Sequence, residues 1–253
     1  MIRIAAAGDL HFGTDSAGSF RPALVDLPDR ADMLLLAGDL TRIGRPEEAA
    51  VLAEELADLG VPVIAVLGNH DYHSDRQDEI VAALEKADVR ILEGASTVVE
   101  VNHSRIGVAG VKGFGGGFAG ACGSDFGERE MKAFIEHSME RAARLQSGLE
   151  DLGRQGADTR IALMHYSPIR ETLQGEPLEI YPFLGSYLLA EAVDHEGADL
   201  VLHGHAHRGT EHGVTPGGIP VRNVAQAVIN RPYRVFEFGD GSGGSHGSSG
   251  SGR

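Results

Sequence analysis

The sequence has one cysteine, Cys122, and therefore cannot form an internal disulfide bond. A chain of 253 residues with a single thiol fits a reducing compartment. Cys122 lies within a glycine-rich stretch, and we interpret it as an ordinary structural or surface thiol rather than a nucleophile.

Long apolar runs are also missing. No stretch approaches the roughly 20 apolar residues that a membrane span needs. The amino terminus leads directly into an apolar strand pattern, without the basic segment and cleavage site of a secretory signal. We therefore expect a soluble cytoplasmic protein with no membrane partner.

Basic residues are scarce: 22 Lys and Arg stand against 37 Asp and Glu, a formal net charge of −15. Binding to a nucleic acid polymer normally requires a basic stripe, so this balance argues against such a partner and against a metal-dependent nuclease. A small phosphorylated substrate remains possible, because bound divalent cations reverse the local field. The GxxxxGK[ST] pattern of a P-loop does not occur in the sequence.

The length and the 42% hydrophobic content predict one large domain, residues 1–238. From residue 239 to 253 glycine and serine dominate, and we expect a disordered tail. Helical patterns cover residues 46–59, 75–87, 128–152 and 188–193, and a loop with a helix is expected within residues 15–32. Apolar strands are predicted at residues 2–7, 33–37, 61–66, 161–164 and 200–202.

The middle of the chain differs from its two ends. Residues 89–92, 97–101 and 105–109 are short β-branched runs joined by turn residues, which predicts successive antiparallel strands. Residues 214–223, which contain a turn, and 234–238 look like closing strands. Together these patterns predict an α/β fold in which two packed sheets carry helices on their outer faces.

Polar side chains follow five of the predicted strands at the point where each ends. They belong to the segments Asp9-Leu10-His11, Gly38-Asp39, Gly68-Asn69-His70-Asp71, His165 and Gly204-His205-Ala206-His207. If the strands are parallel neighbours, their carboxyl ends meet in one crevice, where open α/β sheets bind ligands. Each segment alone also fits a turn or a helix cap, and Asp39 could bind nearby backbone amides; their joint placement favours one site.

A set of imidazole, carboxylate and amide groups suits Mn, Fe or Zn better than Ca, and an all-oxygen Mg site would not need so many histidines. Among these metals we expect Mn. His203, one residue before Gly204, is interpreted as a structural histidine at a strand end.

The five segments, in this order, resemble the five motifs of the calcineurin-like metallophosphoesterase superfamily. They extend from residue 9 to residue 207, most of the chain. The resemblance implies a four-layer αββα sandwich, with two mixed β-sheets flanked by helices, and two divalent metal ions at the strand ends.

The resemblance also implies roles for single residues. One metal would be held by Asp9, His11 and His207, the other by Asn69, His165 and His205, with Asp39 bridging the two. Such a metal pair can share a hydroxide that attacks phosphorus in line. His70 would protonate the leaving oxygen or stabilise the transition state, and Asp71 would either orient the His70 ring or stabilise the turn.

The motif forms narrow the substrate class. Gly38-Asp39 continues as Leu40-Thr41-Arg42, not as the Val-Asp-Arg-Gly of the protein serine/threonine phosphatase branch. The compact motifs look more like the bacterial branch that contains cyclic-nucleotide phosphodiesterases, so we expect a phosphohydrolase that favours phosphodiesters over phosphomonoesters. Sequence proximity to the ligands predicts that Tyr166, Arg170 and Arg208, together with Tyr181, contact the substrate.

Two alternatives remain open at this point. Some relatives use the same fold as a scaffold for protein partners without catalysis, but they lack the histidine that follows the Asn ligand, whereas His70 is present here. The glycine-rich stretch 113–127, with Phe114, Phe118 and Phe126, is either a mobile loop over the crevice or a surface loop that its aromatic side chains hold to the core.

Overall fold

The fold is described from a computed structural model, which describes residues 1–239. Of the predicted tail, residues 239–253, all but residue 239 lies outside the described residues. None of the helices in the described part of the chain is long and apolar enough to cross a membrane.

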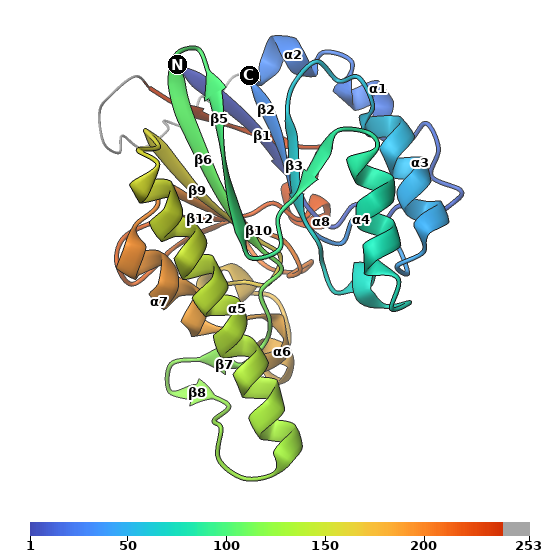
Figure 1. The fold of residues 1–253 in the computed structure, drawn as a ribbon. Helices are drawn as coiled ribbons and strands as arrows, with labels where there is room; N and C mark the ends of the chain where they lie inside the picture. The colour runs from blue at the N-terminus through green and yellow to red at the C-terminus, as the bar shows by residue number, and fades with distance from the viewer. Residues whose placement is uncertain (240–253) are drawn as a thin grey trace, which may run out of the picture.

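Two β-sheets form the centre of the protein (Figure 1). The first has the order β13-β1-β2-β3-β4 and contains β13 (Arg234–Phe238), β1 (Ile2–Ala7), β2 (Met33–Ala37), β3 (Val63–Val66) and β4 (Val89–Ile91). The second has the order β11-β12-β10-β9-β6-β5 and contains β11 (His212–Val214), β12 (Pro220–Asn223), β10 (Leu200–His203), β9 (Thr159–Met164), β6 (Ser104–Val111) and β5 (Ala95–Val101). Both sheets are mixed, because parallel pairs such as β1–β2 and β9–β10 stand beside antiparallel pairs such as β1–β13 and β5–β6.

Side chains alternate between two hydrophobic cores along each inner strand, as a period of two residues requires. In β1, Ile4 and Ala6 face the space between the sheets, where they meet Ile161 and Leu163 of β9. The neighbouring Ala5 and Ala7 face the opposite side. The two sheets therefore pack face to face, and each keeps an outer apolar face that helices must cover.

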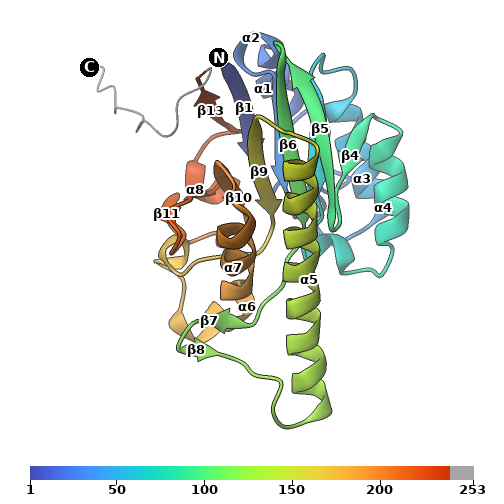
Figure 2. The same ribbon diagram turned by 60° about the vertical axis from the view of Figure 1, so that its left-hand side comes forward.

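Helices cover both outer faces, as Figures 1 and 2 show. On the first sheet lie α3 (Pro46–Leu56) and α4 (Gln77–Glu85), with the short α1 (Arg21–Leu24) and α2 (Leu27–Arg30) nearby. On the second sheet lie α5 (Arg129–Arg154) and α7 (Tyr187–Glu196). The short α6 (Tyr181–Leu184) and α8 (Gln226–Ile229) complete the α-helices of the described chain, which also has 3-10 helices at His70–Tyr72, Glu171–Leu173 and Leu178–Ile180. The predicted four-layer αββα sandwich is confirmed.

The expected antiparallel series in the middle of the chain was wrong in part. Strands β5 and β6 do form an antiparallel hairpin, but β4 joins the first sheet parallel to β3, and β6 pairs in parallel with β9. Short β-branched runs define strands without specifying their partners, because pairing is decided by long-range contacts.

The amino-terminal half of α5 extends beyond the sheets, where it is accompanied by β7 (Gly117–Phe118), β8 (Ala121–Cys122) and α6 (Figure 2). The strands β7 and β8 form a small hairpin within the stretch 113–127. The sequence predicted only a loop there. Phe118 is buried against Tyr181 and Leu184, whereas Phe126 is 88% exposed. The interpretation as a surface loop held by aromatic side chains is the one this packing favours.

Candidate metal centre

The structure brings the five strand ends together at one edge of the sandwich. In the first sheet, Asp9, His11, Asp39 and Asn69 follow the parallel neighbours β1, β2 and β3; in the second, His165, His205 and His207 follow β9 and β10. Because the inner faces of the two sheets pack together, the ends of both sets of strands open into the same space.

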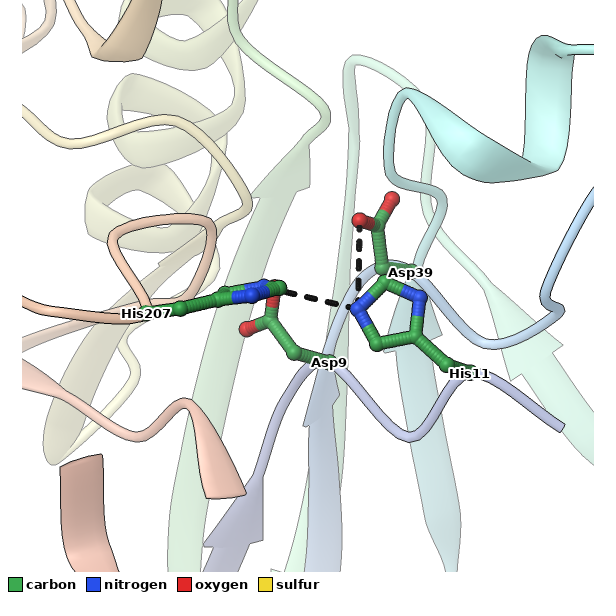
Figure 3. A group of neighbouring side chains, drawn as sticks. All are labelled: Asp9, His11, Asp39 and His207. Carbon is green, nitrogen blue, oxygen red and sulfur yellow. Dashed lines mark hydrogen bonds and ion pairs between the residues drawn. The ribbon is translucent and has the colours of Figure 1, made fainter. Parts of the chain in front are cut away.

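The first group of potential ligands contains Asp9, His11, Asp39 and His207, each with one ligand atom within 4.8 Å of the others (Figure 3). The Nε2 atom of His207 lies 2.8 Å from Asp9 Oδ1. The Nε2 atom of His11 lies 3.4 Å from Nε2 of His207 and 3.8 Å from Asp39 Oδ2. Nitrogen and carboxylate atoms thus converge on one point, as ligands of a single ion do.

The second group contains Asp39, His165 and His205. The Nε2 atom of His165 lies 3.3 Å from Asp39 Oδ1 and 2.9 Å from the side-chain oxygen of Asn69. Asp39 thus belongs to both groups, with Oδ2 near the first and Oδ1 near the second. This is the position that a bridging carboxylate requires.

Backbone carbonyls hold two of the histidine rings through the nitrogen that does not face the centre. The Nδ1 atom of His165 lies 2.9 Å from Ala37 O, and Nε2 of His205 lies 3.2 Å from Phe183 O. This pattern is usual for metal-binding histidines, because the carbonyl fixes the tautomer and the direction of the free nitrogen. His165 therefore offers Nε2 and His205 offers Nδ1.

Several of the same residues have an unusual backbone conformation. Four of the seven predicted ligands have positive φ angles: Asp9 (58°), His11 (47°), Asp39 (48°) and His205 (71°). Such conformations are costly for residues with a side chain and persist where the surrounding structure enforces them, typically at functional sites. The strain therefore supports a binding role for these side chains.

Two glycines make the close approach of the loops possible. A Cβ atom at Gly68 would overlap the carboxylate of Asp39, and one at Gly204 would overlap that of Asp9. Each glycine directly precedes a ligand, Asn69 or His205, so the space it leaves is filled by a ligand from a neighbouring strand.

The electrostatics of the centre favour a neutral imidazole at His205 and at His11. Burial, with nearby His165, lowers the pKa of His205 to about 3. Burial also lowers the pKa of His11, and the Asp9 carboxylate, which bonds to its ring, raises the pKa of His207. A neutral imidazole is the form that binds metal.

His70 lies beside the two groups rather than within them. Its ring centroid is 4.5 Å from that of His11, and its Nε2 is 3.8 Å from Asp39 Oδ2, with 43% of the side chain exposed. The Nδ1 atom lies 2.6 Å from the carbonyl oxygen of Arg42. This carbonyl holds the ring so that Nε2 is on the side of the Asp39 carboxylate.

Asp71 is fully buried and accepts hydrogen bonds from Leu40 N, Thr41 N, Thr41 Oγ1 and Gly68 N. It ties the loop after β2 to the loop after β3. Of the two roles predicted for Asp71, this geometry favours stabilisation of the turn, since the Arg42 carbonyl takes the place of a carboxylate at the His70 ring. Burial and the nearby Asp39 raise the pKa of Asp71 to about 6.

The predicted substrate-binding residues lie in different places. The Tyr166 ring is 4.4 Å from that of His205 and belongs to the centre. Arg170 stacks on Tyr181 at 5.9 Å, and both line a separate pocket of about 350 Å³. Arg208 is exposed, and its backbone N–H bonds to Glu176.

His203 is fully buried, in agreement with a structural role. Its Nδ1 lies 2.8 Å from Gly204 O and its Nε2 lies 2.9 Å from Thr172 Oγ1. Thr172 in turn contacts Ser167 Oγ at 2.9 Å. This buried network joins the loop after β9 to the end of β10.

Sequence reasoning missed two features next to the centre. The Arg42 carbonyl was not considered, because main-chain atoms carry no sequence signal. Lys112 follows β6 directly and is buried, but the predicted strand ended at residue 109, so that its end was not searched for functional side chains.

The donor set fits a pair of divalent cations. It provides two groups with one carboxylate in common, mixed nitrogen and oxygen donors, and main-chain contacts that orient the rings. These donors suit Mn, Fe or Zn.

An αββα sandwich with this double set of ligands at its strand ends defines a metallophosphoesterase type of protein. The family model of the calcineurin-like phosphoesterases matches residues 2–209. The chain therefore belongs to the calcineurin-like phosphoesterase family.

Solved structures with the same fold include phosphopantetheinyl hydrolase from Mycobacterium tuberculosis, with a TM-score of 0.65 and 16% identity over 92% of this chain and 95% of that one. The protein TT1561 of Thermus thermophilus has a TM-score of 0.56 and 19% identity over 88% of each chain. At these identities the likeness shows the fold alone.

Among curated proteins, a Synechococcus protein described as a "probable cyclic nucleotide phosphodiesterase" is 35% identical over 80 residues. This match covers 28% of the present chain and spans 31% of the length of that relative.

Proposed function

We propose that this protein is a cytoplasmic phosphohydrolase that uses two divalent metal ions, with Mn favoured, to hydrolyse a small phosphoester, and that it prefers phosphodiesters to phosphomonoesters. The observation that carries the proposal is the shared Asp39, whose two carboxylate oxygens face two separate groups of ligands. The short match to a cyclic nucleotide phosphodiesterase-like protein supports the diester preference.

The residues divide between the two ions as follows: Asp9, His11 and His207 would hold one, Asn69, His165 and His205 the other, and Asp39 would bridge them. The chemistry that such a pair would supply there is an activated water for attack on phosphorus and positive charge for the phosphoryl oxygens. Asp9 and Asp39 are almost completely buried, so their negative charges favour cations in a space that solvent screens little.

His70 would act on the leaving group. Its Nδ1 donates to the Arg42 carbonyl, which leaves Nε2 free on the half-exposed side of the ring. From there it can give a proton to the departing ester oxygen or stabilise charge in the transition state. Tyr166, Arg170 and Arg208 remain candidates for substrate contacts, and Tyr166 has the strongest geometric support.

The scaffold alternative finds no specific support in the structure. Two observations support catalysis instead: His70 follows Asn69, and the potential ligand atoms within each of two groups that share Asp39 lie within 4.8 Å of one another. Catalysis is therefore the function that the geometry supports best.

The test is hydrolysis of bis(p-nitrophenyl) phosphate and p-nitrophenyl phosphate by the Mn²⁺-loaded protein, with Asp39→Asn as the control. We expect metal-dependent hydrolysis, a higher kcat/KM for the diester, and loss of both activity and bound metal in the variant. A higher kcat/KM for the monoester would overturn the diester preference. Bound metal without hydrolysis of either ester would contradict the proposed reaction.

A further inference from the structure

Lys112 extends the row of functional strand ends in the second sheet. Strand β6 runs parallel to β9 with Val111 opposite Met164, so the next residues, Lys112 and His165, are also neighbours. The backbone N–H of His165 donates to Lys112 O at 3.0 Å. Along this edge of the sheet, β10, β9 and β6 therefore present His205, His165 and Lys112 in turn.

The ammonium group of Lys112 lies among three aromatic rings. Its Nζ is 5.1 Å from the centroid of the Tyr72 ring, 4.9 Å from that of Phe114 and 5.2 Å from that of Tyr166. Tyr72 and Tyr166 follow the ligand segments that contain Asn69 and His165. The lysine is thus held between two loops of the metal centre.

No carboxylate in the described part of the chain forms an ion pair with Lys112, and Glu93 and Asp39 act on its charge only at longer range. Within residues 1–239, no carboxylate oxygen lies within 4.0 Å of Nζ, whose one hydrogen bond is a long one, 3.4 Å, to Gly113 O. The carboxylate of Glu93 pairs with Arg141 at 3.4 Å and accepts from the backbone N–H of Lys112. Lys112 itself is only 6% exposed.

A buried ammonium with no carboxylate in direct contact is costly, and aromatic rings and the more distant charges of Glu93 and Asp39 compensate for only part of the cost. The same position is attractive for an anion that enters the centre. The whole chain carries a net charge of −15, so this lysine provides a local positive charge in a protein that otherwise repels phosphates.

We propose that Lys112 binds a second phosphate group of the substrate, next to the phosphoryl group at the metal centre. The arrangement supports this role: β6 is the neighbour of β9, and the Tyr166 ring lies 5.2 Å from Lys112 Nζ and 4.4 Å from the ring of His205. The substrate class is then a phosphoester with a neighbouring phosphate, such as an ester of diphosphate. This inference rests on the proposed phosphoester hydrolysis, because it assigns a part of the same substrate.

The experiment measures binding of inorganic diphosphate and of orthophosphate to the Mn²⁺-loaded full chain by calorimetry, at a fixed free Mn²⁺ concentration. Wild type is compared with Lys112→Met, which removes the charge, and Lys112→Arg, which keeps it. Lys86→Met, an exposed lysine at the end of α4, controls for the change in net charge. Metal content and melting temperature are recorded for each protein, and Lys112→Gln replaces Lys112→Met if the latter does not fold.

We expect Lys112→Met to weaken diphosphate at least 10-fold and orthophosphate less than 2-fold, with Lys112→Arg within about 3-fold of wild type and unchanged metal content. Equal weakening of both anions, or no weakening of either, would overturn the proposal. Absence of ester hydrolysis by the wild type would instead refute the proposed function, and the binding comparison would still decide the role of Lys112.

Discussion

The Nδ1 atom of His70 lies 2.6 Å from the carbonyl oxygen of Arg42, so the loop after β2 orients a side chain that the loop after β3 supplies. The buried Asp71 joins the same two loops through four hydrogen bonds that it accepts from Leu40, Thr41 and Gly68. The position of His70 is therefore a property of two strand ends together.

Replacing His70 tests its role in proton transfer. We expect His70→Ala to lower kcat about 10²- to 10⁴-fold, the usual contribution of a positioned general acid, while bound metal stays at the wild-type level. Steady-state kinetics and metal analysis check this. The neighbouring exposed His73 provides the matched control: His73→Ala should retain the wild-type rate. A His70→Ala variant with full kcat would contradict the role.

The substitution Gly68→Ala tests whether metal binding depends on the close approach of the loop after β3 to Asp39. A methyl group at this position would collide with the Asp39 carboxylate, so Gly68→Ala should displace Asp39 and weaken metal binding about 10-fold or more. Metal titration of the apo protein measures the change. Gly153→Ala, at a roomy position in α5, should bind metal as the wild type does. Unchanged affinity in Gly68→Ala would mean that Asp39 does not bind metal from its observed position.

A substitution at Thr172 tests how much the buried network around His203 contributes to stability. The substitution Thr172→Val keeps the shape of the side chain but removes the hydroxyl that contacts His203 Nε2 and Ser167 Oγ. An unsatisfied buried polar group costs about 1 to 3 kcal/mol, so the free energy of unfolding should fall by that amount in urea denaturation. Thr14→Val, at an exposed position, should change it by less than about 0.5 kcal/mol. Equal effects of the two variants would show that the network contributes no stability.

His203 also predicts a pH dependence of stability. Burial lowers its pKa from 6.5 in an unfolded chain to about 4 in the fold. Between these values the unfolded state binds more protons, so stability present above pH 6.5 is lost as the pH falls towards 4. The difference corresponds to about 3 kcal/mol.

The measurement is urea denaturation of the metal-free protein at several pH values, compared with His203→Gln, which cannot titrate there. Wild type should lose more stability than the variant between pH 6.5 and pH 4. Parallel pH profiles of the two proteins would show that His203 is not buried in its neutral form.

Local sequence predicted the elements that carry the site. Apolar runs that end in Gly followed by Asp, Asn or His marked β1, β2, β3 and β10, and the predicted helix at 128–152 agrees closely with α5 (Arg129–Arg154). Such patterns are local, because burial of a strand and the turn that ends it both act over a few residues.

The pairing of strands in the sheets could not be predicted from short segments. The run at residues 89–92 was expected to pair antiparallel with its successors, but β4 lies parallel to β3 in the other sheet. Its short length and β-branched composition are compatible with either partner. The hairpin of β7 and β8 was missed because a glycine-rich stretch has little strand propensity.

The sequence alone determined which polar residues stand at the strand ends, since each predicted ligand is placed there by its own segment. Only the tertiary structure decided how they act together: that Asp39 faces both groups, that the Arg42 carbonyl directs His70, and that Lys112 stands beside His165. The reason is physical. These relationships depend on which strands are neighbours and in which register, and both are set by packing between segments far apart in the chain.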